Sequence, residues 1–207
     1  MMKSEFMIAL RVTLVTLVLT GLVYPLVMTG LAQVIAPHAA NGSLVTDDKG
    51  TVIGSELIGQ NFTSPAYVRP RPSATNDESD SSKPKPYNAT NSAASNYGPT
   101  SQALYDRVKA DVERLQKANP GAIGPVPDEL VTASASGLDP DLSPEAAFWQ
   151  VPRIAKARGI TAERVKKVVT GEIKGPTFGL LGETRVNVLS VNRALDSTFG
   201  SPPAAAK

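Results

Sequence analysis

The chain has 207 residues, with 21 Lys and Arg against 19 Asp and Glu, and a formal net charge of +2. The basic residues are spread along the sequence, which excludes the clustered positive charge that a nucleic-acid-binding protein needs. Cysteine is absent and the one histidine is His38. The composition therefore excludes disulfides, a thiolate nucleophile and a multi-histidine zinc site within this chain.

The stretch 12–35 is apolar and uncharged. A helix of roughly 20 such residues crosses a bilayer, so the stretch predicts a transmembrane helix, with Pro25 favouring a kink near Tyr24. Lys3 and Arg11 precede the stretch, and no further Lys or Arg follows it until position 49. This charge bias predicts that residues 1–11 are cytoplasmic and that the bulk of the chain lies outside.

A cleaved signal peptide is the alternative interpretation, with a small-residue site at 30–32. The apolar stretch is longer than the roughly 7 to 15 residues of a signal peptide's apolar region, and a cut after Ala36 would leave Pro37 first. These two features favour a retained anchor.

Small and hydroxyl-bearing residues recur within the stretch 12–35. Such residues allow helices to pack closely in lipid, or they are tolerated in a lone anchor. The first possibility predicts a face for a partner helix, formed by Thr13, Thr16, Thr20 and Gly21.

The sequence after the apolar stretch predicts a neck at 36–42 and one exported domain at 43–200. Two short β-branched runs, 44–46 and 51–53, flank a turn that contains Gly50, which predicts a hairpin. The prolines in 69–74 exclude a central strand of a sheet and favour an extended, edge-like path of the chain. The polar segment 76–92 offers little apolar surface to bury, which predicts a mobile loop.

Helix start signals follow the polar segment. Thr100 or Ser101 precedes an apolar stripe with a stop at Asn119, and Ser143 precedes Pro144. Two further helices are predicted, one closed by Gly159 and one capped by Thr161.

The remaining elements are short. The residues 129–133 are a strand candidate, and 184–195 predicts a strand followed by a helix capped by Asn187. The tail 201–207 is predicted to be disordered. Together these elements predict an α+β fold: a single N-terminal transmembrane helix, then one mixed domain with short strands and several short helices.

No phosphate-binding loop, dinucleotide fingerprint or nucleophile elbow is present. Carboxylates such as Asp139 and Asp141 leave a membrane-anchored hydrolase as an alternative hypothesis, although turn and cap roles explain these residues more simply. An anchored extracytoplasmic binding module is the other alternative.

Several segments in this order closely resemble the C subunit of the Kdp-type potassium-transporting ATPase over nearly the whole chain. They are 54–62, 69–74, 95–100, 126–140, 143–144, 150–153, 157–159 and 185–189. The resemblance implies a non-catalytic accessory subunit in the inner membrane. Its implied partners are a channel-like potassium translocator, an ATP-hydrolysing P-type subunit and a small membrane peptide.

The resemblance also implies that such subunits raise the ATP affinity of the hydrolysing subunit, through a Ser-Gly stretch and a downstream Gln. The matching residues are Ser134, Ser136, Gly137 and Gln150. ATP is cytoplasmic, whereas the charge bias places these residues outside, so ATP is expected only through the complex. Packing, turn and backbone-binding roles are the alternative interpretation of these four residues. Beyond the helix face named above, contacts with partner subunits are expected at Arg69, Arg71, Asn96, Asp139 and Arg153.

Overall fold

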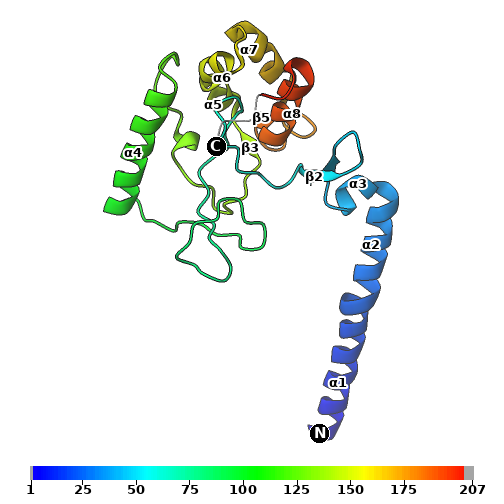
Figure 1. The fold of residues 1–207 in the computed structure, drawn as a ribbon. Coiled ribbons are helices and arrows are strands. Elements are labelled where there is room, and N and C mark those ends of the chain that lie inside the picture. The colour runs from blue at the N-terminus through cyan, green and yellow to red at the C-terminus, as the bar shows by residue number, and fades with distance from the viewer. Residues whose placement is uncertain (1, 203–207) are drawn as a thin grey trace. The chain divides into compact units, whose positions relative to one another are not determined.

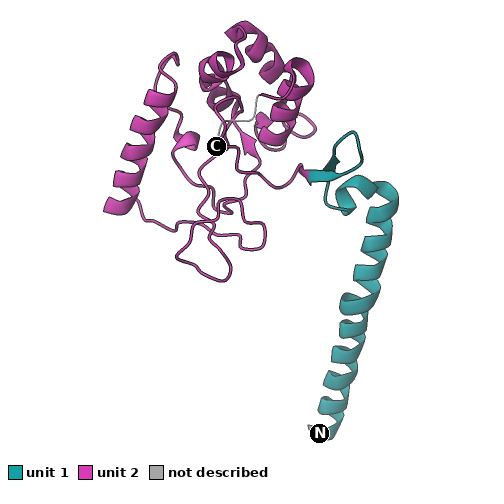
Figure 2. Ribbon diagram, in the orientation of Figure 1, with its two compact units in different colours: residues 1–53 teal, residues 54–207 magenta. Residues whose placement is uncertain are grey.

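The computed structural model describes residues 2–202, so most of the predicted disordered tail, 201–207, lies outside the described residues. The chain divides into two compact units, residues 1–53 and 54–207 (Figure 2). The boundary falls at the end of the predicted second strand, 51–53.

The first unit begins with one long helix. It comprises α1 (Met2–Val18), a π-helical turn (Leu19–Val23) and α2 (Tyr24–Ile35), so it starts ten residues before the predicted stretch. The part from Lys3 to Ile35 is long and apolar enough to cross a membrane, by length and composition. The predicted neck contains a short helix, α3 (Pro37–Ala40).

The π-helical turn ends at Val23, two residues before Pro25. The backbone N–H of Tyr24 donates to the carbonyl of Leu19, five residues back, whereas Pro25 has no N–H to donate. Wide turns of this kind and prolines are the usual causes of helix kinks. The kink itself stays a prediction.

The predicted hairpin is confirmed as a two-stranded sheet of β1 (Leu44–Thr46) and β2 (Val52–Ser55). The Asp47 carboxylate accepts the backbone N–H groups of Lys49 and Thr51, and Gly50 has a φ of +80°. An aspartate and a glycine thus shape the turn.

The second unit packs helices around a small antiparallel sheet with the order β3-β5-β4 (Figure 1). Val186 of the central strand pairs with Leu142 on one side and Ile173 on the other. The strands are β3 (Asp141–Leu142), β4 (Ile173–Lys174) and β5 (Arg185–Asn187). The helices are α4 (Gln102–Ala118), α5 (Pro144–Trp149), α6 (Val151–Arg158), α7 (Ala162–Gly171) and α8 (Val188–Phe199).

The core lies among α5, α6, α7, α8 and β5. Ile154, Val165, Val186, Val191 and Leu195 have no exposed surface. Leu115 joins this core from α4, whose Val108 and Val112 pack against it while half exposed. Apolar burial of this extent is the dominant stabilising term in a cysteine-free domain, and the α+β fold class is confirmed.

The predicted helix starts are confirmed. The side chains of Ser101, Ser143 and Asn187 accept the backbone N–H three residues ahead at the starts of α4, α5 and α8. Gly159 ends α6 in the left-handed conformation, and Thr161 precedes α7 without a side-chain cap hydrogen bond. Local polar signals thus set the helix boundaries.

The predicted strand at 129–133 is wrong. The residues Asp128–Leu130 form a 3₁₀ turn, and the hydroxyl and N–H of Thr132 both donate to the Asp128 carbonyl. The Glu129 carboxylate accepts the N–H of Ser143 at 2.8 Å. These side-chain bonds compete with strand pairing, which apolar patterning alone does not reveal.

The polar segment 76–92 has a defined hydrogen-bond framework. Thr75 and Asn88 are buried, the Thr75 hydroxyl donates to the Lys85 carbonyl, and the Asn88 amide donates to the carbonyl of Asn76. Side-chain hydrogen bonds replace apolar burial here. The mobility of the segment stays a prediction.

Candidate functional site

The proline-rich segment 65–75, which we name the arm, is the part of the domain that gathers most of the predicted site residues. Prolines at 65, 70 and 72 remove backbone donors that a strand would need. The backbone of the arm is bound by side chains of the helices. The arm therefore depends on a few polar side chains for its position.

Two side-chain amides hold the arm as a neighbouring strand would. Asn192 of α8 accepts the Val68 N–H at 2.8 Å and donates to the Val68 carbonyl at 2.9 Å. Gln150, between α5 and α6, accepts the Arg69 N–H at 2.9 Å and donates to the Arg69 carbonyl at 3.0 Å. Both amides are buried, so their hydrogen bonds have no competition from water.

Two arginines of α6 complete the attachment. Arg153, only 7 % exposed, donates to the carbonyls of Pro65 and Tyr67 and to Gln150 Oε1. Burial, and then the charge of Arg69, lower the pKa of Arg153. Arg158 donates to the Ala66 carbonyl at 2.8 Å and pairs with Asp196 at 2.7 Å. An arginine fork suits such multiple bonds because its donors are fixed in one plane.

A tyrosine links the same arm to α8. The Tyr67 hydroxyl donates to Asp196 Oδ2 at 2.7 Å, and the Arg158 guanidinium lies 5.1 Å from the centre of the Tyr67 ring. Burial first, and then the hydrogen bond and charge of Asp196, raise the pKa of Tyr67 to about 12. The phenol therefore stays protonated and keeps donating at neutral pH.

The Ser-Gly stretch forms a tight turn against the other end of the arm. Ser134 Oγ accepts the Gly137 N–H at 2.8 Å, and the Ser73 hydroxyl donates to the Gly137 carbonyl at 2.7 Å. Gly137 has a φ of +68°, and a Cβ there would lie 2.6 Å from the Thr75 methyl and 2.7 Å from the carbonyl oxygen of Ala93. Only glycine fits this position without displacement.

Arg71 and Asp139 form an ion pair at 3.1 Å beside this turn. Arg71 also donates to the Thr132 carbonyl, and its own carbonyl accepts the Tyr87 hydroxyl at 2.8 Å. Asp139 Oδ1 accepts the N–H of Asp141. Both charged groups therefore hold segments of this chain together.

The residues implied for ATP occupy two separate places along the arm. Gln150 is 2 % exposed, and both of its amide atoms are hydrogen-bonded within the chain. Ser134 is buried, and its hydroxyl accepts the Gly137 N–H. Ser136 is exposed, and its hydroxyl accepts the Leu138 N–H at 3.1 Å. The expected ATP contact stays a prediction for these residues.

The expected partner-contact residues divide into exposed and internal groups. Thr13, Thr16, Thr20, Gly21 and Asn96 are exposed, and the Thr20 hydroxyl donates to the Thr16 carbonyl. The backbone of Arg69 and the side chains of Arg71, Asp139 and Arg153 make the internal contacts described above, although Arg69, Arg71 and Asp139 stay partly exposed. Contact with partner subunits stays a prediction for all nine.

Sequence reasoning missed Asn192 and Arg158, although both hold the arm. Each lies on an amphipathic helix where a polar residue at a buried position is the available signal. A buried Asn or Arg in the core stripe of a helix therefore indicates a hydrogen-bond partner in a loop.

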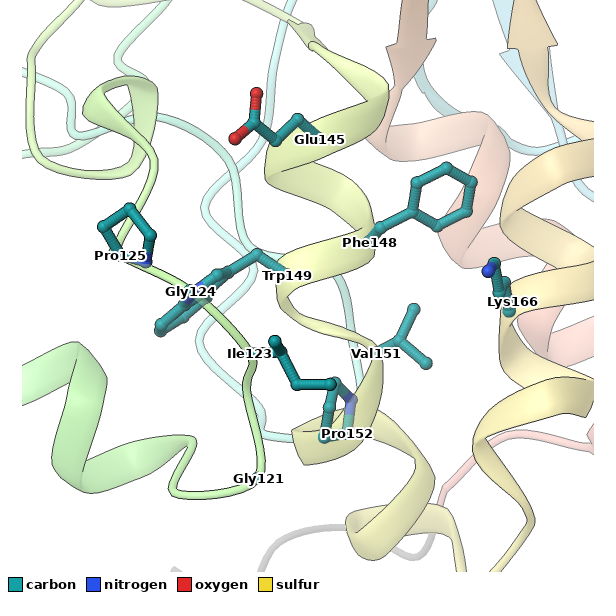
Figure 3. A pocket seen from close by; sticks show the side chains of 10 residues that line it. All are labelled: Gly121, Ile123, Gly124, Pro125, Glu145, Phe148, Trp149, Val151, Pro152 and Lys166. Atoms are coloured by element: carbon teal, nitrogen blue, oxygen red, sulfur yellow. The ribbon is translucent and has the colours of Figure 1, made fainter.

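The sequence also missed an apolar hollow of about 640 Å³ between the loop 121–125 and helices α5 to α7 (Figure 3). The Lys166 ammonium lies 5.6 Å from the centre of the Phe148 ring, and the buried indole N–H of Trp149 has no hydrogen-bond partner among the described residues. Figure 3 shows Trp149 and Phe148 on one side of the hollow and Lys166 on α7. Loop and helices far apart in sequence form this hollow, so periodicity does not predict it.

Comparison with known proteins identifies the relatives of this chain. Residues 6–197 match the family model of the K⁺-transporting ATPase, c chain. A potassium-transporting ATPase KdpC subunit of Myxococcus xanthus is 56 % identical over 205 residues, which cover 99 % of this chain and 93 % of that protein. KdpC subunits of Methylobacterium nodulans and Rhodopseudomonas palustris are 61 % and 58 % identical, over 88 % and 95 % of this chain and 91 % and 99 % of those proteins. The arm, the Ser-Gly turn and most of the apolar N-terminal helix lie within the matched residues, and the chain belongs to the KdpC family, the C chain of the K⁺-transporting ATPases.

Proposed function

We propose that this chain is a non-catalytic accessory subunit that assembles with a channel-like potassium translocator, a P-type ATP-hydrolysing subunit and a small membrane peptide. The match to the c-chain model over residues 6–197 is the observation that carries this proposal. The long apolar helix supplies a segment for membrane assembly, and its exposed Thr and Gly face suits close helix packing. Any effect on the ATP affinity of the hydrolysing subunit is proposed to act through assembly, since Gln150 and Ser134 are occupied within the chain.

Growth in low potassium tests the proposal. A strain that lacks its own C subunit but keeps the other subunits should regain growth when this chain is expressed, and the other subunits should co-purify with it in detergent. Growth at high potassium is the control, because the complex is then dispensable. Recovery of the chain alone, with no restored growth in low potassium despite normal expression, would contradict the proposed function.

We further propose that the N-terminus is cytoplasmic and that the domain 43–200 lies on the outer side of the inner membrane. Lys3 and Arg11 before the apolar stretch support this orientation. Protease added to intact spheroplasts should then digest the domain while sparing a cytoplasmic marker protein. Protection of the domain in intact spheroplasts, with digestion only after lysis, would reverse the orientation.

A further inference from the structure

Three arginines line one open hollow on the second unit. The hollow has a volume of about 440 Å³ and lies between the arm, the segments 61–63 and 86–87, and α4. Arg69 and Arg71 reach it from the arm, and Arg114 reaches it from α4. No Asp or Glu is among the residues that line it, so its charged lining is entirely positive.

The acids that pair with two of these arginines lie outside the lining of the hollow. Arg71 pairs with Asp139 at 3.1 Å, and Arg114 pairs with Asp111, its neighbour on α4, at 2.8 Å. The Arg114–Asp111 pair is a surface pair three residues apart, a type that contributes little to stability. Arg71 also donates to the carbonyls of Thr132 and Ala133, and Arg114 donates to Asp111 from both Nε and Nη2. Each guanidinium has five N–H donors, so both arginines keep donors that these contacts do not use.

Arg69 differs from the other two because no carboxylate pairs with it in the part of the chain that the structure describes. Its Nη2 donates to the Thr63 carbonyl at 2.6 Å, and its buried Nε has no hydrogen-bond partner. Burial, and then the charge of Arg114, lower the pKa of Arg69. Positive charge at this position is therefore both partly desolvated and opposed by a like charge, which an anion in the hollow would relieve.

We propose that this arginine hollow binds a phosphate-type oxyanion. Guanidinium groups match the oxygens of phosphate through paired, charge-assisted hydrogen bonds, and three of them converge here around a space without acids. The phosphate comes either from solution or from a lipid headgroup, since both present the same oxygens. The site is independent of the proposed role in the potassium complex.

Thermal unfolding of the full chain in detergent tests the site with inorganic phosphate as the probe, exchanged for chloride at constant ionic strength. Phosphate at tenfold its dissociation constant should raise the Tm of the wild type by about 3 to 6 °C. Arg114→Gln should abolish this rise and, because it removes the repulsion on Arg69, should leave the Tm without phosphate unchanged or higher. Lys109→Gln, an equal charge change at an exposed site on the same helix, should keep the rise.

The source of the phosphate is separated by repeating the comparison in nanodiscs. If the headgroup binds, the Tm of the wild type should exceed that of Arg114→Gln in phosphatidylglycerol without added phosphate. Phosphatidylcholine, whose choline neutralises its phosphate, should give the wild type no such advantage. If free phosphate binds, the difference should arise only after phosphate is added. An equal rise in Tm for wild type and Arg114→Gln, or no rise in Tm under any condition, would overturn the proposal. A defect of Arg114→Gln that is confined to assembly with an acidic partner subunit would also overturn it.

Discussion

Gln150→Ala is expected to lower the free energy of unfolding of the full chain by about 3 kcal/mol. The substitution leaves the N–H of Arg69 and one donor of Arg153 without the acceptor that Gln150 Oε1 supplies at 2.9 and 2.7 Å. It also removes the donor to the Arg69 carbonyl. Each buried group left without a partner costs about 1 to 3 kcal/mol. Urea unfolding in detergent, followed by the fluorescence of Trp149, the one tryptophan, measures this loss.

Gln116→Ala is the matched control for this prediction. Gln116 lies exposed on α4, so the same side-chain truncation there should change the free energy of unfolding by less than about 0.5 kcal/mol. If Gln150 instead contacts nucleotide, Gln150→Ala should weaken ATP affinity in the assembled complex while stability stays at the wild-type value. That result would contradict the role assigned to Gln150 in holding the arm.

The predicted parts of the fold share a short-range cause. The caps at Ser101, Ser143 and Asn187 act over three residues, and the left-handed stop at Gly159 depends on its own backbone angles. The hairpin turn is shaped by Asp47 and Gly50 within the same few residues. Both partners of such an interaction lie within a few residues of each other, so the local sequence is enough to predict it.

The features that the sequence did not reveal depend on residues distant in the chain. Asn192 binds a backbone 124 positions away, and Glu129 binds the N–H of Ser143 instead of leaving its segment to pair as a strand. The arginine hollow combines the arm with α4 for the same reason. The predicted backbone-binding role of Gln150 is confirmed, although its partner at Arg69 could not be deduced from spacing.

Gly137→Ala should destabilise the chain more than Gly159→Ala, by about 1 to 3 kcal/mol. Both glycines have nearly the same left-handed backbone, with φ of +68° and +65°, so the conformational cost of alanine, about 1 to 2 kcal/mol, is common to both. They differ in surroundings. A Cβ at Gly159 meets no atom within 4 Å, whereas at Gly137 it meets the Thr75 methyl and the Ala93 carbonyl oxygen at 2.6 and 2.7 Å.

The Ala93 oxygen cannot move away easily, because the N–H of Ala93 donates to the Ser136 carbonyl across the same turn. Urea unfolding of both variants in detergent gives the difference, and the common backbone cost cancels in it. A second variant, Thr75→Ser, removes the methyl but keeps the hydroxyl that binds the Lys85 carbonyl. Combined with Gly137→Ala, it should recover part of the loss, because one of the two close contacts disappears. Equal losses for Gly137→Ala and Gly159→Ala would mean that the turn yields freely, and the glycine would then be free to serve a ligand rather than the packing of the arm.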